Sequence, residues 1–432
     1  MSTNTRAEAS PLEEIEHLVQ SRASTLALDV DSPDGESRLL ELIHDAVGRW
    51  SKDHSRGQRP YDLHDPQGVV QRAFRNLARY GPLTDLLTDD DVWEIMINSP
   101  AEIFVRRHSG GSRFHHEVFH DDDHVARTLT KLLDDSSGSH RKLDPLEGLQ
   151  DAQLDDGARV HIVHGDLSRG GHLIVNIRKF SGVAITRLDE LVDRGSLSRP
   201  AAAFLSAAIR SRLSVVFAGA PGAGKTTLLS CCAAELDPSL RVVIAEEVFE
   251  ADVTEVANVA SMQTRPARTD RPAVDLRRLV AGFLRMAPDV AIVCEVRDRE
   301  AMPLLMTLSS GVTGYTTIHA GSARQALSRL RFLAQLSGSA DVPLSALNTL
   351  VSESIDIVVH TERGPEGPRV SSILAVEDLV SGTGSGQFTV TDVFTREQPI
   401  GDLAWNGLVP VRAAERMGAR GIDLREILEE GR

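Results

Sequence analysis

Cysteine is scarce in this chain of 432 residues, and long apolar runs are missing. The three cysteines, Cys231, Cys232 and Cys294, lack metal-ligand spacing and fall in segments expected to be buried, so we expect reduced thiols and no structural disulfide. No apolar stretch approaches the roughly 20 residues that cross a bilayer. The first residues lack the basic flank and apolar centre of a signal peptide. We therefore expect a cytoplasmic protein that contacts a membrane only through a partner.

Basic residues are also few for a protein that binds nucleic acid. The chain has 47 Lys and Arg residues against 62 Asp and Glu residues, which gives a formal net charge of -15. General affinity for a nucleic-acid backbone normally comes from basic patches. This charge balance argues against nucleic acid as the main substrate.

A complete phosphate-loop motif is present. Residues 213–227 read LSVVFAGAPGAGKTT, an apolar strand-like run that leads into the pattern G-x-x-x-x-G-K-[ST] and then a helix-like stretch. Glycines let the backbone turn its N–H groups toward phosphates, Lys225 supplies a positive charge, and the Thr226 hydroxyl is a Mg²⁺ ligand. The alternative, a Gly-rich turn that matches by chance, is weakened by the order of strand, loop and helix. The predicted ATP-binding residues are Gly219, Ala220, Pro221, Gly222, Ala223, Gly224, Lys225, Thr226 and Thr227.

The chain is longer than one core usually supports, so we expect several parts. We set the boundaries of these parts where the spacing of apolar residues changes from helical to strand-like, or where it stops. After the phosphate loop, apolar strands alternate with helical stretches, as a mostly parallel sheet requires. The predicted parts are a flexible extension (1–36), a helical cap (37–80), a mixed α/β domain (81–180), a linker (181–200), a P-loop ATPase domain (201–395) and a weakly patterned tail (396–432).

Acidic side chains follow two of the predicted strands. Glu246 and Glu247 come directly after RVVIA, and Glu295 follows VAIVC. Open α/β sheets build their sites at the carboxyl ends of strands. A phosphate-loop enzyme needs one carboxylate for Mg²⁺ and another for the attacking water, and Glu246 and Glu295 fit these two roles. The alternative is that both residues end their strands and face solvent.

A histidine, His319, follows the polar β-type run GVTGYTTI. This position would allow a hydrogen bond to a phosphate or to a catalytic carboxylate. A single histidine is more often a core or turn residue, so the neighbouring motifs decide its interpretation.

Four segments carry a family resemblance, in the order GAPGAGKTT, RVVIAEEVFE, LRMAPDVAIVCEVRDREA and TGYTTIHAGSARQALSRL. This order resembles the type II/type IV secretion ATPase superfamily, and within it the CpaF/TadA branch of Flp/Tad pilus assembly is most similar. Upstream segments such as GPLTDLLTDDDVWEIMINSPAEIFV and LDDGARVHIVH resemble the N-terminal domain of the family. The resemblance spans about residues 75–395.

The resemblance implies an α/β fold with a RecA-like P-loop NTPase domain, a smaller mixed α/β N-terminal domain and an N-terminal helical extension. It implies an ATPase with ATP and Mg²⁺ as cofactors, assembled as a ring-shaped homohexamer. Such a motor powers pilus assembly or type II/IV secretion from the inner face of the cytoplasmic membrane. Its implied partner is an inner-membrane platform protein, with no nucleic acid expected.

The resemblance also implies roles for single residues. Lys225 contacts phosphate, and Thr226 and Glu295 serve the metal. Glu246 activates water, and His319 is the histidine of the family's histidine box. For the last four of the following arginines a structural salt bridge is an equal alternative. The candidate phosphate-contacting or arginine-finger residues are Arg159, Arg178, Arg265, Arg277, Arg285 and Arg297.

Five positions depart from the family pattern. Glu247 replaces an Asp of the acidic box, and Cys294 and Asp298 replace glycines on either side of Glu295 and Arg297. Ala281 and Ala287 replace arginines that are common in the pilus branch. None of these changes removes a catalytic group, so they put the turnover rate and the subunit contacts in doubt more than the chemistry.

Three other functions stay open. A VirB11-like ATPase for conjugation or effector secretion would differ in its partner and cargo, and the N-terminal helical extension favours the pilus branch over it. A nucleotide-gated assembly scaffold would bind ATP with little turnover. A DNA-translocating motor would need a basic channel, which the acidic balance disfavours.

Overall fold

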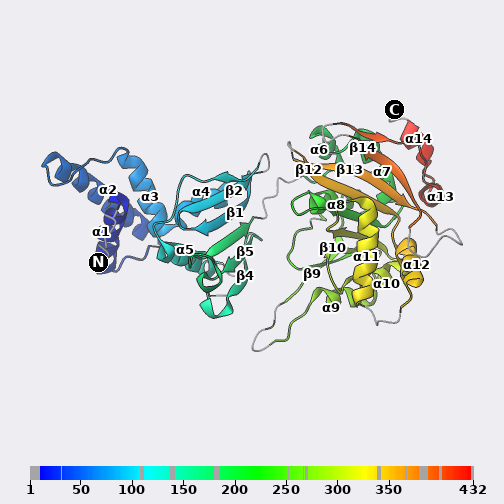
Figure 1. Cartoon of the computed structure of the whole chain (residues 1–432), viewed down its shortest axis with the longest axis horizontal. Coiled ribbons are helices and arrows are strands. Elements are labelled where there is room, and N and C mark those ends of the chain that lie inside the picture. The colour runs from blue at the N-terminus through cyan, green and yellow to red at the C-terminus, as the bar shows by residue number, and fades with distance from the viewer. Residues whose placement is uncertain are drawn as a thin grey trace. The chain divides into compact units, whose positions relative to one another are not determined.

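The structure is a computed structural model of the chain. It describes residues 10–30, 32–107, 111–136, 142–179, 185–251, 253–265, 267, 271–337, 342–364, 367–378, 388–397 and 401–429. The chain divides into two compact units, Met1–Val183 and Ala184–Arg432, and each is described by itself. Figure 1 labels the elements of both units.

Unit 1 begins with three helices. Each starts at a Ser or Asp N-cap followed by proline, a combination that satisfies free N–H groups and presets the helical φ angle. Their core contains Val19, Ile43 and Ala73, all fully buried. The helices are α1 Pro11–Thr25, α2 Pro33–Ser55 and α3 Pro66–Ala78.

Helix α1 occupies the part of residues 1–36 where we expected a flexible extension. Its apolar positions are too few to predict a helix alone, but α2 and α3 cover them. The buried Glu16 carboxylate also accepts hydrogen bonds from Asn76 Nδ2 at 2.7 Å and from His120 Nε2 at 2.8 Å. Contacts distant in sequence therefore order this segment. Residues 1–9 lie outside the described part of the chain.

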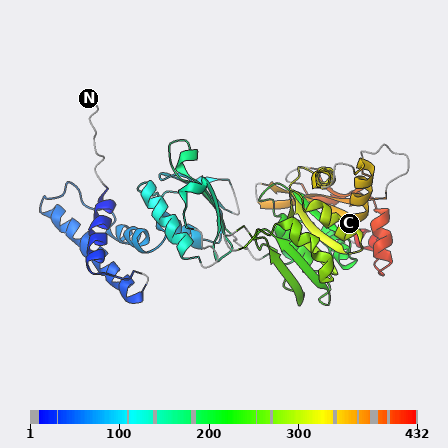
Figure 2. The same cartoon turned by 90° about the horizontal axis from the view of Figure 1, so that it is seen from below.

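The rest of unit 1 is a six-stranded antiparallel sheet with the strand order β3-β2-β1-β6-β5-β4. Helix α5 packs on the sheet through Val125, Leu129 and Leu133, and Figure 2 shows it beside the strands. The strands are β1 Val92–Ser99, β2 Glu102–Arg107, β3 Arg113–Phe114, β4 Leu149–Gln153, β5 Arg159–Val163 and β6 Ile174–Arg178. The helices are α4 Thr84–Thr88 and α5 Asp122–Asp134, with short turns η1 Gly81–Leu83, η2 Pro145–Glu147 and η3 Gly165–Leu167.

Unit 2 is built on a nine-stranded sheet with the order β15-β14-β13-β12-β7-β11-β10-β8-β9. From β12 to β9 the pairs are parallel, and β13 to β15 add an antiparallel edge. The strands are β7 Val215–Gly219, β8 Arg241–Glu246, β9 Asn258–Gln263, β10 Val290–Val296, β11 Thr313–Ile318, β12 Ile357–Gly364, β13 Gly367–Val376, β14 Val390–Arg396 and β15 Leu403–Trp405.

Helices cover both faces of this sheet. Successive residues of β7 point to opposite faces, so Phe217 packs with α7 and α8 while Val216 packs with α10 and α11. This three-layer arrangement confirms the predicted α/β P-loop fold. The helices are α6 Leu188–Asp193, α7 Arg199–Arg210, α8 Lys225–Ala233, α9 Leu276–Ala281, η4 Phe283–Met286, α10 Ala301–Ser309, α11 Ala323–Ser337, α12 Leu344–Ser354, α13 Val411–Gly418 and α14 Leu424–Glu429.

Two segments are more ordered than the sequence predicts. In the expected linker 181–200, Leu188, Leu191 and Leu197 are buried in the core of unit 2, while residues 181–184 lie outside the described chain. In the segment 396–432, which we expected to be a weakly patterned tail, helices α13 and α14 bury Met417 and Leu428 in the same core. Short amphipathic helices of this kind give little periodic signal.

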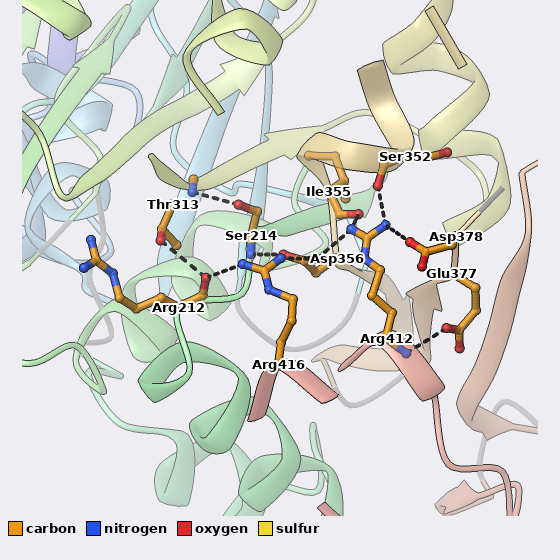
Figure 3. Close-up of polar contacts among 11 residues, drawn as sticks. Arg212, Ser214, Thr313, Ser352, Ile355, Asp356, Glu377, Asp378, Arg412 and Arg416 are labelled. Carbon is orange, nitrogen blue, oxygen red and sulfur yellow. Dashed lines mark hydrogen bonds and ion pairs between the residues drawn. The ribbon is translucent and has the colours of Figure 1, made fainter. Parts of the chain in front are cut away.

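Buried ion pairs fix the C-terminal helix α13 to the sheet (Figure 3). The Asp356 carboxylate is 2% exposed, and it accepts from Arg412 Nη2 at 2.7 Å, from Arg416 Nη1 and from the Ser214 backbone N–H at 2.8 Å. Arg412 also donates to the carbonyls of Ser352 and Ile355. Ser214 and Asp356 immediately precede β7 and β12, so this network lies at the N-terminal ends of these two strands, whereas the phosphate loop follows the C-terminal end of β7.

Within the described residues, no helix combines the length and apolar character that crossing a membrane requires.

Candidate nucleotide-binding site

The phosphate loop joins β7 to α8 and depends on glycine at two positions. Gly219 forms a register pair with Thr361 of β12, and a Cβ atom on Gly219 would lie 2.3 Å from the Thr361 carbonyl oxygen. Gly224 has φ +81°, a left-handed conformation that favours glycine, and it caps the N-terminus of α8. The loop therefore presents backbone N–H groups and the positive end of the α8 dipole together.

Lys225 is 7% exposed and lies at the start of α8. Its Nζ donates to the Ala220 carbonyl at 2.9 Å and lies 3.2 Å from His319 Nδ1. The lysine of the loop and the histidine after β11 are thus brought together across 94 residues of sequence.

Glu295 lies near the end of β10 and contacts two cationic or polar partners. Its Oε1 is 3.0 Å from His319 Nε2 and 3.2 Å from Arg297 Nε. Burial opposes ionisation of this carboxyl, but the hydrogen bond from His319 and the charge of Arg297 outweigh it and hold the pKa of Glu295 at about 2. Glu295 is therefore a permanent anion next to the loop, as a metal-binding carboxylate must be.

Glu246 ends β8 and is 1% exposed. Its Oε1 accepts from the backbone N–H groups of Glu250 and Ala251, both at 2.8 Å. Its Oε2 is buried and accepts no N–H or O–H hydrogen bond from another described residue. Burial raises the pKa of Glu246 above its usual value, although hydrogen bonds from the Cys294 thiol and from the two backbone N–H groups oppose the shift. One oxygen is thus fixed by two backbone N–H groups, and the other is buried with part of its hydrogen-bonding capacity unused.

Two further acidic residues, Glu250 and Glu247, contact residues of the predicted site. The Thr226 hydroxyl donates to Glu250 Oε2 at 3.4 Å, and the sequence motifs do not predict a role for Glu250. The sequence feature that could have indicated Glu250 is its position four residues after Glu246. Glu247 lies 2.8 Å from Arg297 Nη2, so Arg297 bridges the acidic residues that follow β8 and β10.

These residues fit a nucleotide with Mg²⁺. The glycine turns provide the backbone approach to phosphate, and Lys225 supplies the compensating charge. Hydroxyl and carboxylate oxygens of Thr226 and Glu295 are the hard ligands that Mg²⁺ prefers. The buried Oε2 of Glu246 provides a hydrogen-bond acceptor inside the same site.

The comparison with known proteins gives the family. Residues 76–361 match the family described as Type II/IV secretion system protein. The chain belongs to this family. The family part of the predicted resemblance is therefore confirmed, and the choice of branch within it is a separate question.

Three of the similar proteins carry names from conjugation and type IV secretion systems. The chain is 34% identical over 231 residues to the conjugal transfer protein TrbB of Rhizobium radiobacter, which covers 50% of this chain and 68% of TrbB. It is 31% identical over 304 residues to the type IV secretion system protein PtlH of Bordetella pertussis, covering 64% of this chain and 87% of PtlH. The VirB11 ATPase of the Brucella suis type IV secretion system is 24% identical over 68% of this chain and 94% of VirB11, with a TM-score of 0.37.

The six candidate arginines of this secretion-family protein do not gather at one site. Arg265 forms a β-bridge with Val274 and donates to the Pro272 carbonyl at 3.2 Å. Arg277 on α9 and Arg285 in η4 are exposed. Neither is brought to the loop by a contact among the described residues of unit 2.

Arg159 and Arg178 belong to unit 1. They are directly opposite each other on the antiparallel strands β5 and β6. Their predicted approach to the nucleotide would involve the other unit, so it stays a prediction. Of the six arginines, Arg297 is the one that the structure places beside Glu295.

Proposed function

We propose that this chain is a Mg²⁺-dependent ATPase. The observation that supports this most directly is the buried Glu246 carboxylate, whose Oε1 is fixed by two backbone N–H groups and whose Oε2 accepts no N–H or O–H hydrogen bond from another described residue. A carboxylate held in this way can orient a water for in-line attack on the γ-phosphoryl group. Phosphoryl transfer depends mainly on such positioning and on charge neutralisation.

The other residues of the site would bind the phosphates, hold Mg²⁺ and orient Glu295. Lys225 and the N–H groups of the loop bind the phosphates, and the Thr226 hydroxyl and Glu295 would hold Mg²⁺. When bound, Mg²⁺ neutralises charge that develops on the phosphate oxygens. His319 donates to Glu295 and orients it, and Arg297 fixes Glu295 relative to Glu247.

We further propose that ATP hydrolysis drives a type IV secretion or conjugation machine. The names of TrbB and PtlH favour this VirB11-like alternative over the CpaF/TadA pilus-assembly branch. A homohexameric ring, an inner-membrane partner and a position at the cytoplasmic face of that membrane belong to the same proposal.

The experiment is Mg²⁺-dependent phosphate release from ATP by the purified full chain. Wild type is compared with Lys225→Ala and Glu295→Gln. We expect turnover in the wild type, loss of at least about 100-fold in both variants, and loss on chelation of Mg²⁺. Wild-type protein that binds ATP but releases no more phosphate than Lys225→Ala would instead identify a nucleotide-gated scaffold.

A further inference from the structure

The hairpin of β12 and β13 borders the phosphate loop along its length. Thr361 of β12 is paired with Gly219, and its Oγ1 donates to the Ala218 carbonyl at 3.1 Å. On β13, the Pro368 Cβ would lie 2.8 Å from a Cβ atom placed on Gly224. The first and last glycines of the motif are therefore both packed against the hairpin.

Arg363 contacts the phosphate loop between Gly219 and Gly224. It lies at the exposed end of β12, directly opposite Pro368. Its Nη1 donates to the carbonyl of Gly222, the middle glycine of the loop, at 3.2 Å. All three glycines of the phosphate loop thus meet the same hairpin, at Thr361, Arg363 and Pro368.

The bond to Gly222 acts at a glycine that has a positive φ angle. Gly222 has φ +72°, and a glycine loses more entropy than other residues when its conformation is fixed. The peptide between Gly222 and Ala223 is held on its other side by the Ala223 N–H, which donates to the Ala220 carbonyl at 3.2 Å. A guanidinium donor on the outer side restricts rotation of this peptide before any phosphate is bound.

We propose that Arg363 is a positioning residue for the phosphate loop, which fixes the turn at Gly222 and so reduces the ordering of the loop that nucleotide binding requires. The inference rests on nucleotide binding at the loop as proposed above. Because Arg363 contacts the loop from outside, it acts equally on the ground state and the transition state. Its loss should therefore raise KM for ATP and leave kcat nearly unchanged.

The test measures affinity and turnover separately. The full chain is studied as wild type, Arg363→Ala and Arg363→Lys, with the dissociation constant of a fluorescent, slowly hydrolysed ATP analogue, the kcat and KM for ATP, and the melting temperature. The matched control is Arg324→Ala, which removes another exposed arginine that pairs with Asp392 on a different part of unit 2.

We expect Arg363→Ala to weaken binding of the analogue and to raise KM by about three- to tenfold, the effect of losing one hydrogen bond of ordinary strength at an exposed site. The kcat and the melting temperature should match those of Arg324→Ala. Arg363→Lys keeps a charged donor and should restore the affinity to within about twofold of wild type.

Two results would overturn the inference. One is an affinity of Arg363→Ala equal to that of Arg324→Ala. The other is a fall in kcat and melting temperature with an unchanged KM, which would indicate a purely structural role. Failure of the proposed ATPase gives a different pattern, because a wild type without turnover would still reveal the affinity difference between the variants.

Discussion

Two carboxyl groups at the ends of neighbouring strands have opposite environments. Burial raises the pKa of Glu246, whereas His319 and Arg297 overcome burial at Glu295 and hold its pKa at about 2. Separated pKa values of this kind distinguish a proton-accepting group from a permanent anion. Glu246 is therefore suited to orient and deprotonate water, and Glu295 to bind a metal.

This contrast predicts the pH dependence of turnover. Glu246 must be ionised to act, so kcat should fall as the pH drops through its raised pKa, which lies above the ordinary 4.5. Glu295 stays ionised throughout this range and contributes no such loss. The measurement is kcat at saturating ATP from pH 8 down to the acid limit of the folded protein. A kcat that stays constant until the pH is below 4.5 would contradict the assignment.

At the scale of elements, local patterns predicted the phosphate loop and the central strands well. Strand β7, the loop and α8 are contiguous, so one short motif encodes them. Contacts distant in sequence were not predictable in this way. Arg363 reaches Gly222 across 141 residues, and α13 depends on a buried aspartate before β12. The helices α1 and α13 gain their order from such partners rather than from their own periodicity.

The attachment of α13 gives a stability prediction. Asp356→Asn should lower the free energy of unfolding by about 3 kcal/mol, because Arg412 and Arg416 would lose the buried anion that compensates them. The control Asp392→Asn breaks an exposed pair with Arg324 and should cost less than about 1 kcal/mol. Urea unfolding followed by tryptophan fluorescence measures both. Equal stability of the two variants would show that the network does not anchor the helix.

At the scale of the whole molecule, the family match covers parts of both units. The sequence motifs predicted this family and its fold. The branch could not be settled from them, because the phosphate-binding and acidic motifs serve the same chemistry whatever the machine exports. The relatives named above favour conjugation and type IV secretion over pilus assembly.

Our central claim is that Glu246 orients the water that hydrolyses ATP and is not needed for ATP binding. The most direct measurement compares ATP binding and phosphate release in Glu246→Gln, with Glu353→Gln on the exposed side of α12 as the control. We predict that Glu246→Gln binds ATP within about threefold of wild type but loses on the order of 100-fold or more in kcat, while Glu353→Gln keeps most of its turnover. A Glu246→Gln variant that retains more than about a tenth of wild-type kcat would contradict the account.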